Sequence, residues 1–133
     1  MTSPSPATGI VLLTHGHIGR ALIEVAEFIL DRALTEVRVV SFRQSTAENT
    51  GDAEIRQAID TADLGSGVLV LTDISGASPC NHVTRVSGGA NVAVISGLNL
   101  AMLIRAWNYR NRPLRQLAEL AQEGAIRDIR TYP

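Results

Sequence analysis

The run Gly-Val-Leu-Val-Leu-Thr at positions 67–72 constrains the fold of this chain more than any other segment. Its apolar residues are continuous rather than alternating, which is typical of a strand covered on both faces. Such strands occur in parallel sheets that carry helices on both sides. The run therefore predicts an open α/β sheet with this strand near its centre.

Apolar and amphipathic segments alternate along the rest of the chain, as expected for repeated strand–helix units. Short β-rich runs predict three further strands, at 10–14, 37–42 and 91–96. Apolar residues at helical spacing predict the intervening helices, at 18–30, 52–62, 100–109 and 114–122. Ser78-Pro79 offers an N-cap residue followed by proline at the first helical position, which predicts another helix towards Val86. The segment 125–132 is compatible with a continued helix or with an extended arm.

The composition describes one domain over residues 1–133, with a flexible polar start at 1–8. With 12 basic against 13 acidic residues the chain lacks the basic surface that a nucleic-acid partner requires. All the basic residues are arginine, which excludes a P-loop lysine and Schiff-base chemistry. The single cysteine, Cys80, and the absence of a long apolar run predict a cytoplasmic protein without direct membrane insertion.

His15 stands where the first predicted strand ends and an amphipathic helix begins. Open α/β sheets bind ligands at the carboxyl edge of their strands, and a helix amino terminus offers N–H groups and a positive dipole end to a phosphate. His15 is therefore a candidate phosphoryl carrier.

Two further loops converge at the same predicted edge, 73–81 and 97–99. If Asp73 accepts a hydrogen bond from Nδ1–H of His15, Nε2 is free to attack phosphorus, and the carboxylate stabilises the cationic ring that forms. Neither a metal nor a cofactor is required. The expected phosphate contacts are the backbone and hydroxyl groups of Gly16, Ser75, Gly76 and Ser78. Asn99 either contacts a partner in its loop or caps the next helix.

Two other interpretations of these residues are disfavoured. His15 and His17 with Asp73 would form a metal site, but alternate residues at a helix start diverge and no third strong ligand is placed nearby. A receiver domain phosphorylated on Asp73 would need a lysine and an acidic pair after the first strand, and the sequence has neither. A regulatory binding module, switched by the charge of a phosphorylated His15, remains open.

Three groups of residues at three predicted strand ends carry a resemblance to a known family. They are Thr14-His15-Gly16 with Gly19-Arg20-Ala21-Leu22, Leu71-Thr72-Asp73 through Gly76-Ala77-Ser78-Pro79 to Asn81, and Ser96-Gly97-Leu98-Asn99 with Met102-Leu103. In this order the chain resembles the IIA proteins of the mannose/fructose/sorbose class of the bacterial phosphoenolpyruvate:sugar phosphotransferase system. The resemblance spans nearly the whole chain.

This resemblance implies a doubly wound sheet, a homodimer, and a histidine that accepts a phosphoryl group from phospho-HPr and passes it to a IIB protein. The phosphorylated residue falls on His15, its orienting carboxylate on Asp73, and Ser78 lies in the phosphate-proximal loop. Family dimers exchange a C-terminal strand, which would make 125–132 an added antiparallel strand. Ala77, Ile74-Ser75 and Cys80 depart from the family pattern. These departures leave the chemistry intact and bear on the choice of partner.

Overall fold

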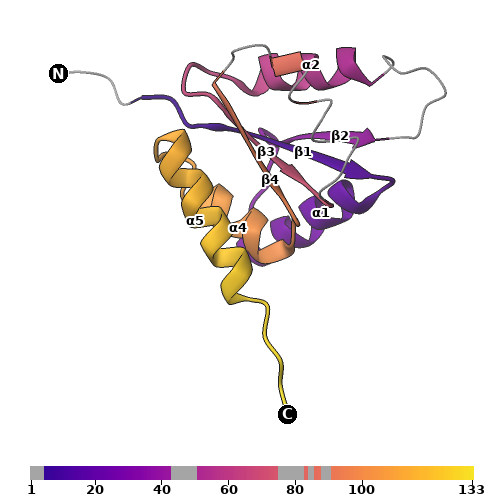
Figure 1. Cartoon of the computed structure of the whole chain (residues 1–133), viewed down its shortest axis with the longest axis vertical. Helices are drawn as coiled ribbons and strands as arrows, with labels where there is room; N and C mark the ends of the chain where they lie inside the picture. Colours follow the sequence, from indigo (N-terminus) through magenta and orange to yellow (C-terminus); the bar gives the residue numbers. More distant parts are fainter. Residues whose placement is uncertain (1–4, 43–50, 75–82, 84–85, 88–90) are drawn as a thin grey trace.

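The computed structural model describes residues 5–42, 51–74, 83, 86–87 and 91–133. Its elements form one sheet between two helical layers (Figure 1). The strands are β1 (Gly9–His15), β2 (Arg38–Phe42), β3 (Val68–Thr72) and β4 (Val92–Ser96). The helices are α1 (Ile18–Leu30), α2 (Asp52–Ala62), α4 (Leu100–Asn108) and α5 (Leu114–Arg127). All eight were predicted from the sequence, and their ends differ by at most one residue except at the carboxyl end of α5.

The sheet has the strand order β2-β1-β3-β4, and every neighbouring pair is parallel. β3 is buried along its whole length and pairs with β1 on one side and β4 on the other. This confirms the interior position that its continuous apolar run predicted. Because β1 and β3 are neighbours, the residues that follow them meet at one edge of the sheet.

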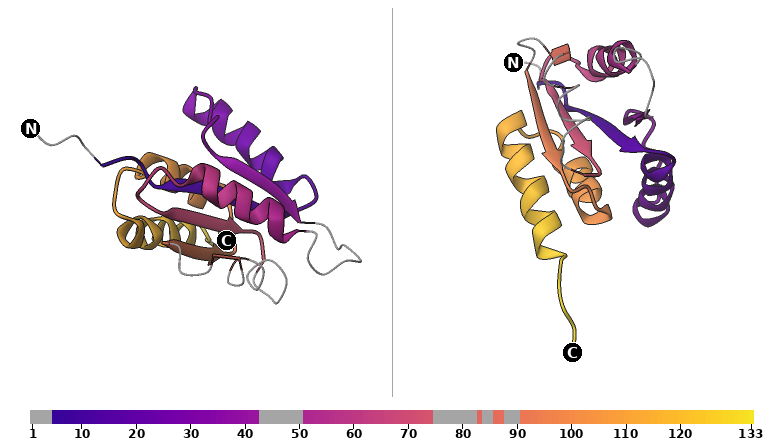
Figure 2. Two further views of the ribbon diagram at one scale, coloured as in Figure 1. Left: turned by 90° about the horizontal axis from the view of Figure 1, so that it is seen from above. Right: turned by 45° about the vertical axis from the view of Figure 1, so that its right-hand side comes forward.

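Successive residues of the strands supply two separate cores. Ile10 and Leu12 of β1 pack in the cluster that contains residues of α1, α4 and α5. Val11 and Leu13 pack in the cluster that contains residues of α2. Figure 2 shows the same division, with α2 over one face of the sheet. The α/β, doubly wound prediction is therefore confirmed, and it follows from the two-residue period of a strand.

The helix predicted from Ser78 towards Val86 lies mostly outside the described residues. Within the described part, Val83, Val86 and Ser87 are helical. Val83 and Val86 are buried in the α2-side core. This segment therefore contributes to the second face of the sheet.

Both ends of the chain make contacts that the sequence did not indicate. Thr8 lies in the segment expected to be flexible, yet it is buried and its hydroxyl donates to the carbonyl of Arg112 at 3.1 Å. α5 continues past the predicted end at 122, because Ala125 packs in the core and an ion pair joins Glu123 to Arg127. Only residues 128–133 form an arm without helix or strand, which projects from the body (Figures 1 and 2).

None of the helices in the described part of the chain is long and apolar enough to cross a membrane.

Candidate functional site

His15 and Asp73 meet at the carboxyl edge of the two central strands. His15 is the last residue of β1, and Asp73 directly follows β3. Nδ1 of the imidazole lies 3.1 Å from Oδ2 and 3.2 Å from Oδ1 of the carboxylate. The side chain of Asp73 is 10% exposed, whereas that of His15 is 36% exposed. The carboxylate is thus held inside the edge while part of the ring stays open to solvent.

Three N–H groups point at the Asp73 carboxylate. Besides the imidazole, the backbone N–H of His15 donates to Oδ2 at 2.8 Å and that of Ile74 donates to Oδ1 at 3.0 Å. Burial raises the pKa of Asp73, but these hydrogen bonds and the attraction of the His15 ring outweigh it, so the pKa lies below its usual value. The carboxylate is ionised at neutral pH.

An ionised carboxylate only accepts hydrogen bonds, so Nδ1 of His15 is the donor in this pair. In a neutral imidazole the proton on Nδ1 leaves Nε2 with a free lone pair. The arrangement therefore sets the tautomer of His15 and makes Nε2 the nucleophilic atom of the ring.

Phe42 packs against the His15 ring and was not singled out from the sequence. The two rings are 5.3 Å apart between centroids, at an interplanar angle of 66°. Phe42 ends β2 and is the register partner of His15 across the β1–β2 pair. Only the strand order shows this contact, because the sequence does not state which strand lies beside β1.

The start of α1 is built from Thr14, Gly16 and Gly19. Gly16 has φ +53°, in the left-handed region, and a Cβ there would meet nothing within 4 Å. The buried hydroxyl of Thr14 accepts a hydrogen bond from the backbone N–H of Gly19 at 2.9 Å. His17 occupies the N-cap position without a side-chain capping bond. Thr14 was part of the matching motif, but the sequence assigned it no role.

Asn99 is the N-cap residue of α4. Its Oδ1 accepts from the backbone N–H of Met102 at 2.9 Å, and its Nδ2 donates to the carbonyl of Ala125 in α5 at 3.2 Å. Of the two uses that the sequence left open, the structure shows the cap. Asn99 therefore ties α4 and α5 together at the edge that carries His15.

The comparison with known proteins assigns the chain to a family. The family model of the fructose IIA component of the phosphotransferase system matches residues 9–122. The chain belongs to this family.

A curated relative of this IIA component is YadI of Escherichia coli K12, named as a candidate phosphotransferase enzyme IIA component. It is 35% identical over 72 residues, which cover 53% of this chain and 49% of the relative. The match thus spans about half the length of that relative.

Solved structures show that the fold is shared over nearly the full length of the chain. The mannose/sorbose-specific IIA subunit of the phosphotransferase system from Enterococcus faecalis matches with a TM-score of 0.83, at 23% identity and 96% coverage of each chain. A sigma-54 interaction domain protein from Enterococcus faecalis matches with a TM-score of 0.76, at 18% identity and coverage of 95% of this chain and 97% of that chain.

Ser75, Gly76 and Ser78 fall outside the described residues. His17 is exposed, and within the described ranges no three His, Cys, Asp or Glu side chains gather where a metal ion would fit.

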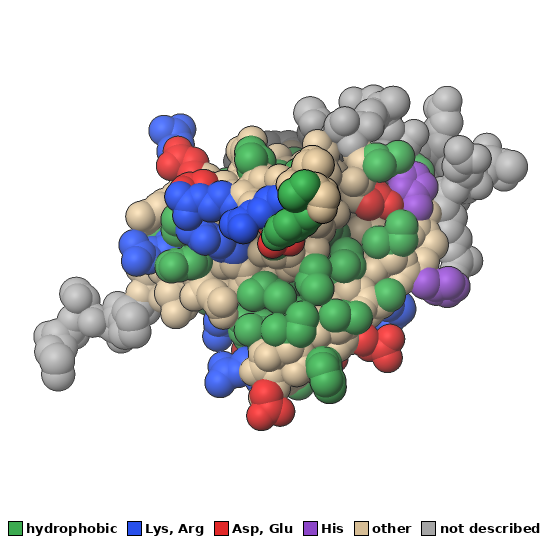
Figure 3. Space-filling model, turned by 90° about the horizontal axis from the view of Figure 1, so that it is seen from below, with side chains coloured by type: hydrophobic (Ala, Val, Ile, Leu, Met, Phe, Trp, Pro, Cys, Tyr) green, Lys and Arg blue, Asp and Glu red, His purple; other side chains and the backbone are tan. Residues whose placement is uncertain are grey.

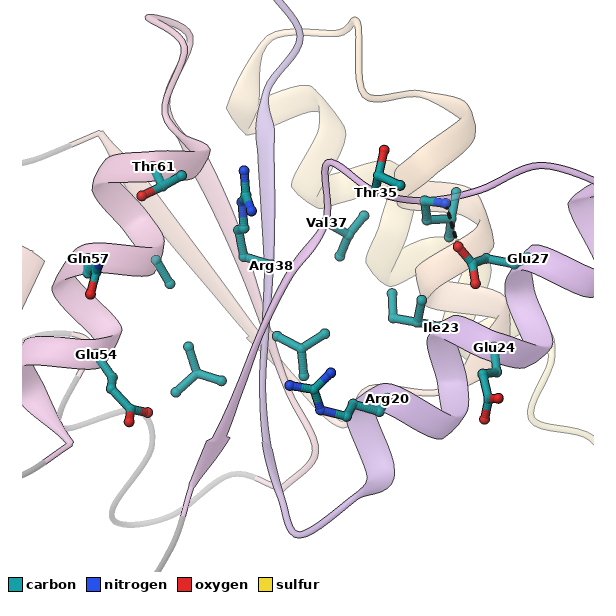
Figure 4. A pocket seen from close by; sticks show the side chains of 14 residues that line it. Arg20, Ile23, Glu24, Glu27, Thr35, Val37, Arg38, Glu54, Gln57 and Thr61 are labelled. Atoms are coloured by element: carbon teal, nitrogen blue, oxygen red, sulfur yellow. Dashed lines mark hydrogen bonds between the residues drawn. The ribbon is translucent and has the colours of Figure 1, made fainter.

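A groove lined by described residues follows the outer edge of β2 and not the His15 edge. It has a volume of about 950 Å³, and its lining includes Arg20 and Glu24 of α1, Arg38 of β2 and Glu54 of α2 (Figure 4). Neither His15 nor Asp73 lines it. The groove has mixed charge, and its lining residues include neither histidine nor cysteine.

An apolar surface lies near the histidines. Figure 3 shows the side of the molecule formed by α1, α4 and α5. Hydrophobic side chains gather on this side, and the histidines lie at its border. α1 contributes exposed apolar side chains to the surface, namely Ile18, Val25, Phe28 and Ile29. Exposed apolar surface of this kind marks contact sites for other proteins.

Proposed function

We propose that this IIA component is a cytoplasmic phosphocarrier that accepts a phosphoryl group from phospho-HPr on Nε2 of His15 and passes it to a IIB protein. The observation that carries the proposal is the contact between Nδ1 of His15 and the ionised Asp73 carboxylate at 3.1 Å. Family membership supports phosphoryl transfer between proteins. The exposed apolar side chain of Ile18, at the start of α1 next to the histidines, supports a protein as the donor, since a donor has to cover the surroundings of His15.

In the proposed step, the Nε2 lone pair of His15 attacks the phosphorus of the donor's phosphohistidine. The P–N bond of the donor breaks as the new N–P bond forms, and its electron pair stays on the donor ring. The His15 ring then holds a proton on Nδ1 and a phosphoryl group on Nε2, so it is cationic. Asp73 stabilises that charge through its hydrogen bond. Attack on the phosphohistidine by the acceptor protein reverses these changes.

The phosphoryl oxygens need hydrogen-bond donors around His15. We propose the backbone N–H groups from Gly16 onwards at the start of α1, where an anion also meets the positive end of the helix dipole. The hydroxyls of Ser75 and Ser78 and the backbone at Gly76 complete the proposed cradle. Their assignment rests on the sequence alone.

Labelling tests this proposal. Labelled phosphoenolpyruvate, the general enzyme of the system and HPr should transfer label to the wild-type chain, and mapping should place it on His15. The variant His15→Ala should take up none. His17→Ala is the matched control, because His17 is an exposed histidine two residues away that makes no capping bond. Label retained by His15→Ala would contradict the proposal.

The chemical stability of the label separates histidine from aspartate. Phosphohistidine survives alkali and is lost in acid, whereas an aspartyl phosphate is lost in alkali. An alkali-labile label would favour phosphorylation on Asp73 instead.

Transfer to an acceptor separates a carrier from a regulatory module. The labelled chain should lose its label to a purified IIB protein on mixing. A label that stays on the chain in the presence of IIB proteins would favour a regulatory contact switched by the charge on His15.

We also propose that the chain acts as a homodimer in which the C-terminal arm is exchanged. Ile129 is 74% exposed and Tyr132 is 77% exposed, so the arm presents apolar surface that its own chain does not bury.

A further inference from the structure

The hydroxyl of Thr14, in the strand that precedes α1, takes the place of an N-cap side chain for this helix. The Thr14 side chain is fully buried at the end of β1, and its Oγ1 accepts from the N–H of Gly19, the second residue of α1, at 2.9 Å. An N-cap side chain ordinarily supplies such a bond to the second or third helical N–H. His17 at the N-cap position supplies none. The capping oxygen therefore comes from the strand beneath the helix.

Gly19 has no side chain, and this leaves the space that the Thr14 hydroxyl occupies. A Cβ at Gly19 would lie 2.6 Å from Oγ1 of Thr14 and 2.9 Å from Cγ1 of Val39. Glycine at this position is what lets the hydroxyl reach the helix backbone. Any larger residue has to displace the hydroxyl or lift the first turn of α1 away from the sheet.

The Thr14–Gly19 hydrogen bond closes the loop that carries the imidazole. It joins the residue before His15 to the first turn of α1, so it bridges the left-handed turn at Gly16. It also leaves the helix tip without a side chain folded over it, because Gly16 and His17 are both exposed. One buried hydroxyl thus holds the loop in place and keeps its outer side open.

We propose that Thr14 is a positioning residue for phosphoryl transfer at His15, an inference that rests on the proposed function. Thr14 does not touch the phosphoryl group. It acts by fixing the position of the His15 ring relative to the backbone N–H groups at the start of α1. Misplacement of reacting groups by about 1 Å slows an aligned reaction by about a hundred-fold.

The variant Thr14→Val removes the hydroxyl and keeps the shape of the side chain. Single-turnover phosphorylation by phospho-HPr, corrected for the folded fraction, should show a maximal rate lowered by about ten- to a hundred-fold. The KM for phospho-HPr should stay unchanged, because the docking surface is intact. Thr14→Ser keeps the hydroxyl and should restore the wild-type rate.

Thr8→Val is the matched control. Thr8 is also a buried threonine beside β1, and its hydroxyl donates to the carbonyl of Arg112 at 3.1 Å, but it lies at the opposite end of the strand. This variant should lose stability without a change in the transfer rate of the folded protein.

If Thr14→Val does not fold, Gly19→Ala tests the same hydrogen bond from its other partner, since its Cβ displaces the hydroxyl. A wild-type rate in Thr14→Val or Gly19→Ala, or an equal loss in Thr14→Ser and Thr14→Val, would overturn the positioning role alone. A wild-type chain that takes no label on His15 would overturn the proposed function and this inference with it.

Discussion

Replacing Asp73 by asparagine should slow phosphorylation of His15 while the chain remains folded. The carboxylate accepts hydrogen bonds from the backbone N–H groups of His15 and Ile74 and from the imidazole. Asparagine has nearly the same shape, but only one of its two terminal atoms accepts. Its NH₂ group must therefore face at least one of these donors.

The expected size of the effect follows from the contact that changes. A hydrogen bond to a charged group contributes about 1.5–3 kcal/mol, and the bond from Nδ1 to Asp73 strengthens as the ring becomes cationic. Losing it in the transition state slows the reaction by about ten- to a hundred-fold, because about 1.4 kcal/mol corresponds to a factor of ten. The backbone N–H left without an acceptor lowers the free energy of unfolding by about 1–3 kcal/mol.

The assay is the rapid-mixing transfer from phospho-HPr at saturating donor, with denaturant unfolding measured on the same samples. Asp63→Asn is the control for loss of a carboxylate charge, because Oδ1 alone of Asp63 accepts from two backbone N–H groups, those of Gly65 at 2.8 Å and Gly67 at 3.1 Å, and the asparagine oxygen can accept both. It should leave the transfer rate unchanged and lower the stability less than Asp73→Asn does. An unchanged rate in Asp73→Asn would remove Asp73 from the mechanism.

Three further predictions concern pH, the loop and the arm. Because the pKa of Asp73 is lower in the folded chain, its stabilisation is present above the unfolded value of about 3.9 and is lost as the pH falls through the folded value. The difference in unfolding free energy between wild type and Asp73→Asn should therefore shrink in acid titrations below that pH, and a constant difference would refute the assignment. Gly16→Ala should lower the free energy of unfolding by about 1–2 kcal/mol in denaturant, because φ is +53° there while a Cβ meets no neighbour; no loss would show that the loop adopts another conformation. Deleting residues 128–133 should convert a dimer to a monomer in light scattering, and a truncated chain that stays dimeric would exclude the exchanged arm.

Sequence patterns located most of the elements because those patterns are local. The continuous apolar run of β3 and the helical spacing of apolar residues in α1 indicate which side chains are buried. The folded structure buries β3 along its whole length and one face of α1. The sequence ended α5 at 122 and left 125–132 open between a continued helix and an arm, so only the fold shows that the helix runs on through Gly124. In the fold that glycine is buried against the Arg105 side chain, where a Cβ would lie within 2.4 Å of Cδ.

Part of the candidate site could be predicted from local patterns, and part of it could not. His15 and Asp73 each follow a predicted strand, so the sequence brought both to the carboxyl edge of a parallel sheet. The roles of Phe42 and Thr14 could not be predicted, because one depends on which strand lies beside β1 and the other on how closely α1 approaches its preceding strand. No periodic pattern in the sequence indicates that Thr14 and Gly19 are in contact.

By itself the sequence determined that this chain forms a parallel α/β sheet with a histidine and a carboxylate at one edge, since hydrophobic periodicity and strand ends are properties of neighbouring residues. The tertiary structure alone decided the strand order β2-β1-β3-β4. That order sets Asp73 on one side of His15 and Phe42 on the other. Strand order depends on how helices distant in the chain pack over both faces of the sheet, and no local pattern encodes that packing.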